Sequence, residues 1–191
     1  MKAPLPPDER ARVEALRRFK VLDTEPEQVY DDIARLAAYV CQTPTALITF
    51  VDDNRQWFKA RVGFGPRETP RDVSFCAHAI LQPGPLVVTD ALDDERFRDN
   101  PLVLEAPYIR FYAGFPLTSD EGLRVGTLCV IDTERRRLFD DQREALGRLS
   151  NVLNALLNSR RTVTYLEGAL NAKRARVAEL EGAQSREESA D

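Results

Sequence analysis

The first quarter of the chain carries two apolar stripes at helical spacing. In residues 8–19, Val13, Leu16 and Phe19 share one side, and acidic residues in the first turn suit the positive end of a helix dipole. Thr24 precedes the second stripe as a candidate cap. The pattern predicts a short helix and then a longer one over residues 26–42, whose apolar face comprises Val29, Ile33, Leu36, Ala37 and Val40.

Shorter apolar runs separated by turn residues follow, and they predict strands. Residues 45–62 form two runs around an acidic turn at 52–54, and residues 110–132 form two more around the turn at 119–122. Because Asp, Asn and Gly tolerate the backbone angles of tight turns, both segments are predicted hairpins.

The segment between the hairpins has mixed character. Residues 63–73 are rich in Gly and Pro and are expected to form a loop, whereas 74–82 read as a short helix capped by Ser74. Residues 86–90 predict a buried strand, and 93–109 an irregular crossing with one helical turn. The order of elements predicts an α+β domain with a mainly antiparallel sheet.

A long helix is predicted from residue 140 to residue 183, where only isolated glycines weaken the helical pattern. Its apolar positions recur every seven residues, the period of a coiled-coil seam, although Arg160 and Lys173 interrupt it. At about 1.5 Å per residue the helix would reach roughly 60 Å, so we expect it to project and pair with its own copy. A helix folded back on the domain is the alternative. The predicted dimer seam comprises Leu149, Leu156, Val163, Leu170 and Val177.

The length of 191 residues suits one core and an extension. We expect an N-terminal helix in 1–22, a core domain in 23–139, the long helix in 140–183 and a disordered tail in 184–191. A net charge of −4 gives no general attraction for nucleic acid, and no apolar run is long enough to span a membrane. The sequence therefore predicts a cytoplasmic protein that binds neither nucleic acid nor membrane.

The stretch SFCAHAI holds the single histidine of the chain, His78, and one of its three cysteines, Cys76. On a helix these side chains point in nearly opposite directions, and no further soft ligands accompany them, so we expect no metal site. Without a known catalytic motif, we expect the chain not to be an enzyme. Cys76 is either a small apolar core group or a reactive thiolate near a helix start, with redox activity as the less favoured alternative.

Polar and aromatic residues embedded among apolar neighbours are the candidate ligand contacts. The alternative for Asp90, Asn100 and Arg110 is that they satisfy backbone groups of the irregular crossing. The candidates are Phe75, Cys76, His78, Asp90, Phe97, Asn100, Arg110, Tyr112 and Thr127.

Several phrases in order carry a family resemblance: VLDTEPEQVYDDIARLAA, ALITFVDDNRQWFKARVGF, ETPRDVSFCAHAIL, VVTDALDDERFRDNPLV, IRFYAGFPL and GTLCVID. Over residues 20–133 the chain resembles GAF domains, of the group found at the N-terminus of bacterial sensor histidine kinases and diguanylate cyclases. The resemblance implies a central antiparallel sheet of five or six strands, with helices from both chain ends on one face. It also implies a small-ligand pocket on the other face, covered by loop and helix crossings within residues 63–108.

The family's known ligands can be compared with this chain. Bilin-binding relatives often have Cys followed directly by His, whereas Ala77 separates Cys76 from His78 here. The cyclic-nucleotide signature Asn-Lys-Phe-Asp-Glu and the cysteine pattern of free methionine sulfoxide reductases are absent from the sequence. The cofactor or ligand stays unidentified.

The resemblance implies a bacterial sensory or regulatory domain that binds a small ligand and signals through a dimeric helix to a partner protein or output domain. A ligand-free interaction scaffold is the alternative. The chain resembles either a stand-alone GAF protein or a fragment that carries a sensor and its signalling helix.

Overall fold

A six-stranded antiparallel sheet forms the centre of the molecule. The computed structural model describes the backbone of residues 2–188 and the side chains of residues 2–176 and 179. Both predicted hairpins are confirmed, and the sheet has the order β3-β2-β1-β6-β5-β4. The strands are β1 (Thr45–Val51), β2 (Arg55–Val62), β3 (Glu68–Pro70), β4 (Leu86–Val88), β5 (Phe111–Thr118) and β6 (Arg124–Asp132).

The prediction of a continuous loop over residues 63–73 was wrong. β3 pairs with the first half of β2, where Trp57 lies opposite Glu68, and the short 3-10 helix η1 (Arg71–Val73) follows it. Strand pairing overrides the local signal here, because a three-residue edge strand needs no apolar alternation of its own.

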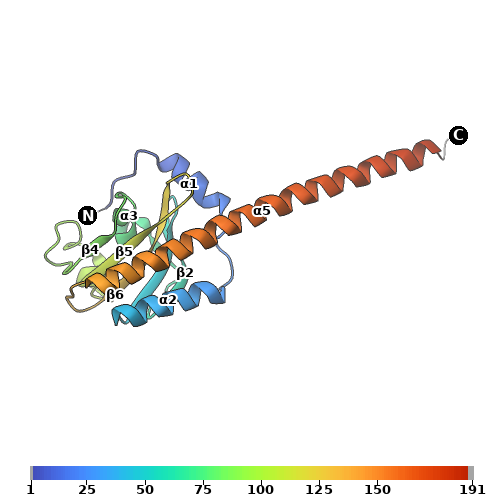
Figure 1. Ribbon diagram of the computed structural model, residues 1–191. Coiled ribbons are helices and arrows are strands. Elements are labelled where there is room, and N and C mark those ends of the chain that lie inside the picture. The colour runs from blue at the N-terminus through green and yellow to red at the C-terminus, as the bar shows by residue number, and fades with distance from the viewer. Residues whose placement is uncertain (1, 189–191) are drawn as a thin grey trace.

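Three helices cover one face of the sheet, as Figure 1 shows. They are α1 (Glu9–Arg18), α2 (Gln28–Cys41) and the first part of α5 (Asp140–Glu188). We call the apolar layer beneath them the helix-side core; it includes Phe50, Trp57, Phe115, Leu128 and Leu153. The prediction that Val29 and Leu36 lie on the buried face of α2 was wrong, because both are exposed; the buried residues are Tyr30, Ile33, Ala34, Ala37, Ala38 and Cys41.

The other face is covered by the crossing between the hairpins, which contains α3 (Phe75–Ala79) and α4 (Pro101–Leu104). The expected cap of α3 is confirmed, since the Ser74 hydroxyl accepts a hydrogen bond from the Ala77 amide over 3.0 Å. A turn occupies 95–99 as expected, but the helix of this crossing is α4, which the sequence reading missed. We call this layer the crossing-side core; it includes Phe58, Phe75, Phe97, Tyr112 and Cys129.

The long helix α5 is confirmed, and its far end projects away from the domain (Figure 1). Its first turns are nevertheless part of the fold, because Leu146, Leu153 and Leu157 are buried in the helix-side core. Leu149 and Leu156 pack partly against the same core. The helix therefore both covers the sheet and extends beyond it.

A buried ion-pair cluster attaches α1 to the sheet. Glu9 receives two hydrogen bonds from Arg12, over 2.7 and 2.9 Å, and two from Arg71, over 2.5 and 3.1 Å. Arg12 also donates to the carbonyl of Val51 over 2.5 Å. Burial raises the pKa of Glu9, but the hydrogen bonds from Arg12 and Arg71 outweigh burial and lower this pKa to about 2. The N-terminal helix is thus held by charge as well as by apolar contact.

Candidate functional site

Aromatic side chains fill the crossing-side core where the sequence predicts a ligand pocket. The rings of Phe75 and Phe97 stack with centroids 4.0 Å apart, and Tyr112 lies against Phe75 at 5.3 Å. His78 meets Phe97 edge-on at 4.8 Å. The cavity beside Phe75, Cys76 and Tyr112 has a volume of only about 20 Å³. The aromatic candidates and His78 thus lie together, but the cavity beside them accommodates no more than a water-sized molecule.

Three of the polar candidates hold the crossing in place. Asn100 caps α4 by accepting from the Leu102 amide and donates to the carbonyl of Val73 over 3.0 Å. Asp90 accepts from the Leu92 amide, and Arg110 donates to the carbonyl of Val103. In this conformation all three satisfy backbone groups, as the structural alternative predicts.

Cys76 and His78 diverge along α3, as their spacing predicts. His78 turns towards Phe97, whereas Cys76 lies below α3 against Tyr112, whose hydroxyl donates to its Sγ over 3.3 Å. Among the residues that the structure describes, no group of three metal-ligating side chains gathers.

A second cysteine meets Cys76 in the centre of this layer. The Sγ atoms of Cys76 and Cys129 are 3.9 Å apart, and Thr49 and Thr127 share a hydrogen bond of 3.2 Å across β1 and β6. Burial raises the pKa of Cys129 well above its ordinary value. Hydrogen bonds received by Cys76 oppose the same burial and hold the pKa of Cys76 below that of Cys129. We call Cys76, Cys129, Tyr112, Thr49 and Thr127 the thiol cluster.

The opposite face contains a buried lysine at an irregularity of the sheet. Ile48 of β1 pairs with Ala60 of β2, and the next residue of β1, Thr49, pairs with Phe58 of β2. Lys59, between Phe58 and Ala60, is therefore the extra residue of a β-bulge. The Lys59 side chain is 0% exposed. Its ammonium donates over 2.7 Å to each of three oxygens, namely Thr24 Oγ1, the Glu25 carbonyl and Glu27 Oε1. Every donor of this buried cation is therefore satisfied.

The same glutamate connects the sheet to α5. Arg160 of α5 donates to Glu27 Oε1 over 2.7 Å and to the carbonyls of Phe19 and Lys20 over 3.2 Å each. Burial raises the pKa of Glu27, but the hydrogen bonds and charges of Lys59 and, to a smaller extent, Arg160 outweigh burial and lower this pKa. We call Lys59, Glu27 and Arg160 the ion-pair node. It joins β2, the segment between α1 and α2, the end of α1 and the long helix.

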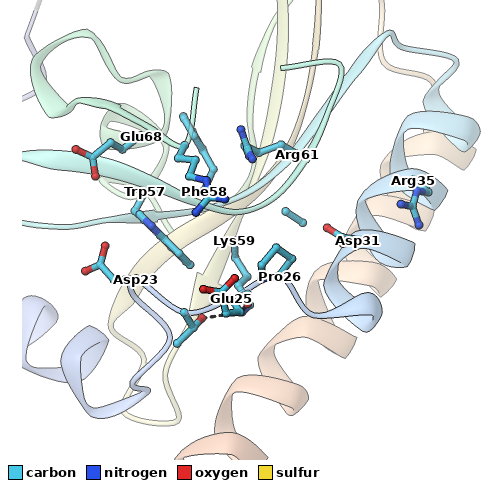
Figure 2. A pocket seen from close by; sticks show the side chains of 13 residues that line it. Asp23, Glu25, Pro26, Asp31, Arg35, Trp57, Phe58, Lys59, Arg61 and Glu68 are labelled. Atoms are coloured by element: carbon cyan, nitrogen blue, oxygen red, sulfur yellow. Dashed lines mark hydrogen bonds between the residues drawn. The ribbon is translucent and has the colours of Figure 1, made fainter. Parts of the chain in front are cut away.

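A groove of about 620 Å³ adjoins the node, and Figure 2 shows Lys59 directed from β2 towards the segment that carries Glu25 and Pro26. The walls of the groove also come from α2 and from the residues at the start of β3. None of the nine predicted ligand contacts lines the groove. The lining residues are Asp23, Thr24, Glu25, Pro26, Asp31, Arg35, Trp57, Phe58, Lys59, Ala60, Arg61, Arg67 and Glu68.

The outer half of the predicted dimer seam is exposed. Val163 is 53% and Leu170 48% exposed, and Leu166 beside them is exposed as well. The guanidinium of Arg160, which the sequence places at an interruption of the seam, turns towards α1 and Glu27. The side chain of Val177 lies outside the described residues.

Known proteins share the fold and the sequence pattern of this chain. The family model "GAF domain" matches residues 25–157. The chain belongs to the GAF domain family. The GAF domain of an Acinetobacter phosphoenolpyruvate-protein phosphotransferase is similar in structure, with a TM-score of 0.54, 15% identity, and 83% of this chain and 98% of that chain covered. The photosensory core module of a Stigmatella aurantiaca phytochrome has a TM-score of 0.60 at 16% identity, covering 90% of this GAF chain and 40% of that one.

A relative in sequence is the cyclic di-GMP phosphodiesterase PA2567 of Pseudomonas aeruginosa. It is 42% identical over 165 residues, which are 86% of this chain and 28% of that protein. The GAF chain thus spans less than a third of the relative's length and is of a kind found in signalling proteins. The prediction that the chain is not an enzyme is contradicted by this relative, because a protein so similar over most of the GAF chain is named as an enzyme.

Sequence reasoning missed the ion-pair node and the partner of Cys76. The sequence does carry a signal for a buried charge at Lys59, because this residue lies between Trp57 and Phe58 on one side and Ala60 on the other within a predicted strand. Arg160 lies 133 positions from Glu27, and Cys129 lies 53 positions from Cys76. Neither pairing has a local signature, because both depend on how distant segments meet.

No described helix combines the length and the apolar character that crossing a lipid bilayer demands.

Proposed function

We propose that this GAF chain is a sensory and regulatory domain of a bacterial signalling protein that turns over cyclic di-GMP. It receives a signal in the GAF domain and passes it through a homodimer of α5 to a partner protein or output domain. The relative's name supports the cyclic di-GMP part of this proposal. We expect the chain to work in the cytoplasm, since three free cysteines suit a reducing compartment.

One observation carries the proposal: α5 is bound to the sheet by the ion-pair node and then leaves the domain with apolar residues exposed. A helix that is rigidly attached at one end and unpaired at the other can transmit a change in the sheet to whatever it contacts. Leu36 and Tyr39 of α2 are exposed on the same side of the sheet as α5. They extend the apolar surface that a second copy would cover.

The ligand half of the proposal concerns the crossing-side core. Phe75, His78, Phe97 and Tyr112 surround the place where a ligand would be expected in this family, and a ligand there has to displace aromatic rings. The small cavity favours a second function: a ligand-free GAF module that works only by protein contacts. Native mass spectrometry of the purified chain separates the two, since a retained ligand adds mass and an interaction module retains none.

Oligomeric state tests the relay. Light scattering after gel filtration should give a dimer for the full chain and a monomer for the double variant Leu166→Glu/Leu170→Glu, because two buried charges per helix disfavour a coiled-coil seam. Ala172→Glu is the matched control, since Ala172 is exposed and lies two residues past Leu170, off the seam. A monomeric wild-type chain at high concentration, or a double variant that stays dimeric, would contradict the proposal.

A further inference from the structure

We propose that Cys76 and Cys129 form a reversible disulfide when hydrogen peroxide enters the crossing-side core, which makes the thiol cluster an oxidation site. The two thiols come from α3 and β6, and they are free in this structure. The reaction requires no bound ligand, although Cys76, Tyr112 and Thr127 are also among the predicted ligand contacts. Only the further step, in which the disulfide serves as an input to the α5 relay, rests on the proposed function.

The distance between the sulfurs is the first support. At 3.9 Å the Sγ atoms of Cys76 and Cys129 are in contact and must approach to about 2.05 Å to bond. The partners differ in rigidity, because Cys129 is in a central strand that pairs with Leu47 and Gly114. Cys76 is in α3, a buried helix of only five residues that lies outside the strand ladder. A shift of α3 towards the sheet can therefore close the gap.

The surroundings of the pair are the second support. Five side chains that can form hydrogen bonds, with exposures of 0 or 1%, gather in the crossing-side core. Hydrogen bonds join Thr49 to Thr127, Cys76 to Cys129 and Tyr112 to Cys76. Apolar residues of the same size would fill this space without polar groups to satisfy. The Tyr112 hydroxyl reaches Cys76 because Gly114 has no side chain, and a Cβ at Gly114 would overlap the phenol. The arrangement supplies donors to the sulfur of Cys76.

Access is limited to small molecules. The cavity of about 20 Å³ beside Cys76 is bounded on its outer side by Phe64 and Leu102, which are only partly buried. A cavity of this size holds about one water molecule. Hydrogen peroxide is nearly as small, whereas glutathione or an aromatic disulfide cannot reach the sulfur in the folded chain.

The reaction balances with peroxide as the oxidant. The Cys76 sulfur attacks one peroxide oxygen, the O–O bond breaks, and the departing hydroxide takes the thiol proton and leaves as water. Cys76 is then a sulfenic acid. The Cys129 sulfur attacks the Cys76 sulfur, the S–S bond forms, the S–O bond breaks, and a second water leaves with the Cys129 proton. Two thiols lose two electrons and peroxide gains them; a dithiol reductant reverses the change.

Closing the bond displaces the residues around α3. Phe75 and His78 flank Cys76 in sequence and both contact Phe97. A pull on α3 therefore rearranges the aromatic rings that fill the predicted ligand pocket, and it displaces the sulfur that accepts from the Tyr112 hydroxyl. Oxidation would thus alter the layer from which the proposed signal starts.

The test uses the full chain, first reduced and then treated with hydrogen peroxide under native conditions. After denaturation and alkylation with N-ethylmaleimide, the oxidised chain should carry one adduct, on Cys41, in place of three. Peptide mapping should identify a Cys76–Cys129 cross-link that dithiothreitol removes. A bulky aromatic disulfide should leave all three thiols free in the folded chain.

Variants assign the roles. Cys129→Ser should stop at a sulfenic acid on Cys76 that dimedone traps once the chain is unfolded in its presence. Cys76→Ser should prevent the reaction, and Cys41→Ser should leave it unchanged. If peroxide leaves all three thiols of the folded wild-type chain alkylatable, or links Cys41 in place of Cys129, the proposal is overturned. Mapping of the wild-type chain decides this even if a variant fails to fold. The mapping gives the same answer for a monomer and for a dimer. Its outcome is therefore separate from the outcome of the oligomeric-state test of the relay.

Discussion

Lys59 and Arg160 donate to the same oxygen atom, Oε1 of Glu27, each over 2.7 Å. One cation comes from the bulge of a central strand and the other from the helix that leaves the domain. Because the lysine side chain is fully buried, its charge depends on the oxygens around it. The carboxylate therefore sets the position of α5 relative to the sheet.

Replacing Glu27 with Gln should lower the free energy of unfolding by about 2 kcal/mol, since one charge-assisted bond to each cation is weakened. Lys59→Met should cost less, because it removes the buried charge together with the need to satisfy it. Urea unfolding measures both. Asp32→Asn is the control, since the pair of Asp32 and Arg35 is exposed and should contribute less than about 0.5 kcal/mol. A Glu27→Gln chain no less stable than the control would show that the node is not a structural connection.

Acid should weaken the attachment of α1 through Glu9. The pKa of this carboxyl is about 2 in the folded chain against 4.5 ordinarily, so the unfolded chain binds more protons between these values. The stabilisation is complete above about pH 4.5 and is lost as the pH falls towards 2. Urea unfolding at several pH values should show a shallower acid slope in Glu9→Gln. Glu14→Gln, which alters the exposed pair with Arg10, should keep the wild-type slope.

Gly114→Ala should destabilise the chain by about 1–3 kcal/mol, although alanine ordinarily suits a strand better than glycine. The added methyl would overlap the Tyr112 phenol. In a Tyr112→Leu background the same substitution should cost much less, because the overlap is gone. Thermal unfolding of the four chains gives the coupling. Equal costs in both backgrounds would mean that the contact between Gly114 and Tyr112 is unimportant.

Phe97→Ala should remove one ring of the stack with Phe75 and cost about 3–5 kcal/mol. The cavity left behind is apolar, so small aromatic solutes such as indole should raise the melting temperature of this variant and not that of the wild type. Leu104→Ala in α4 is the control, since Leu104 is 56% exposed and its loss should change stability little. A variant whose melting temperature does not respond to such solutes would indicate that the crossing collapses into the space.

Elements with a strong local pattern could be predicted from the sequence, as both hairpins, the Ser74-capped helix and α5 show. β3 could not, because its pairing with β2 and not its own residues makes it a strand. The exposed Val29 and Leu36 show a second limit: the apolar stripe on α2 is wider than the face that meets the sheet. The aromatic candidates Phe75, Phe97 and Tyr112 do lie together, but how closely Phe75 packs on Phe97 depends on three-dimensional packing that periodicity does not contain.

The sheet order has a consequence for how the chain folds. β1 has β2 on one side and β6 on the other, and the paired residues Thr49 and Thr127 are 78 positions apart. Closing such a distant pair costs more chain entropy than forming either hairpin, so the two hairpins can form early but the sheet joins late. During synthesis on the ribosome, the N-terminal half must wait for β6 before its open strand edge is covered. Only then do the first turns of α5 have a complete surface on which to pack.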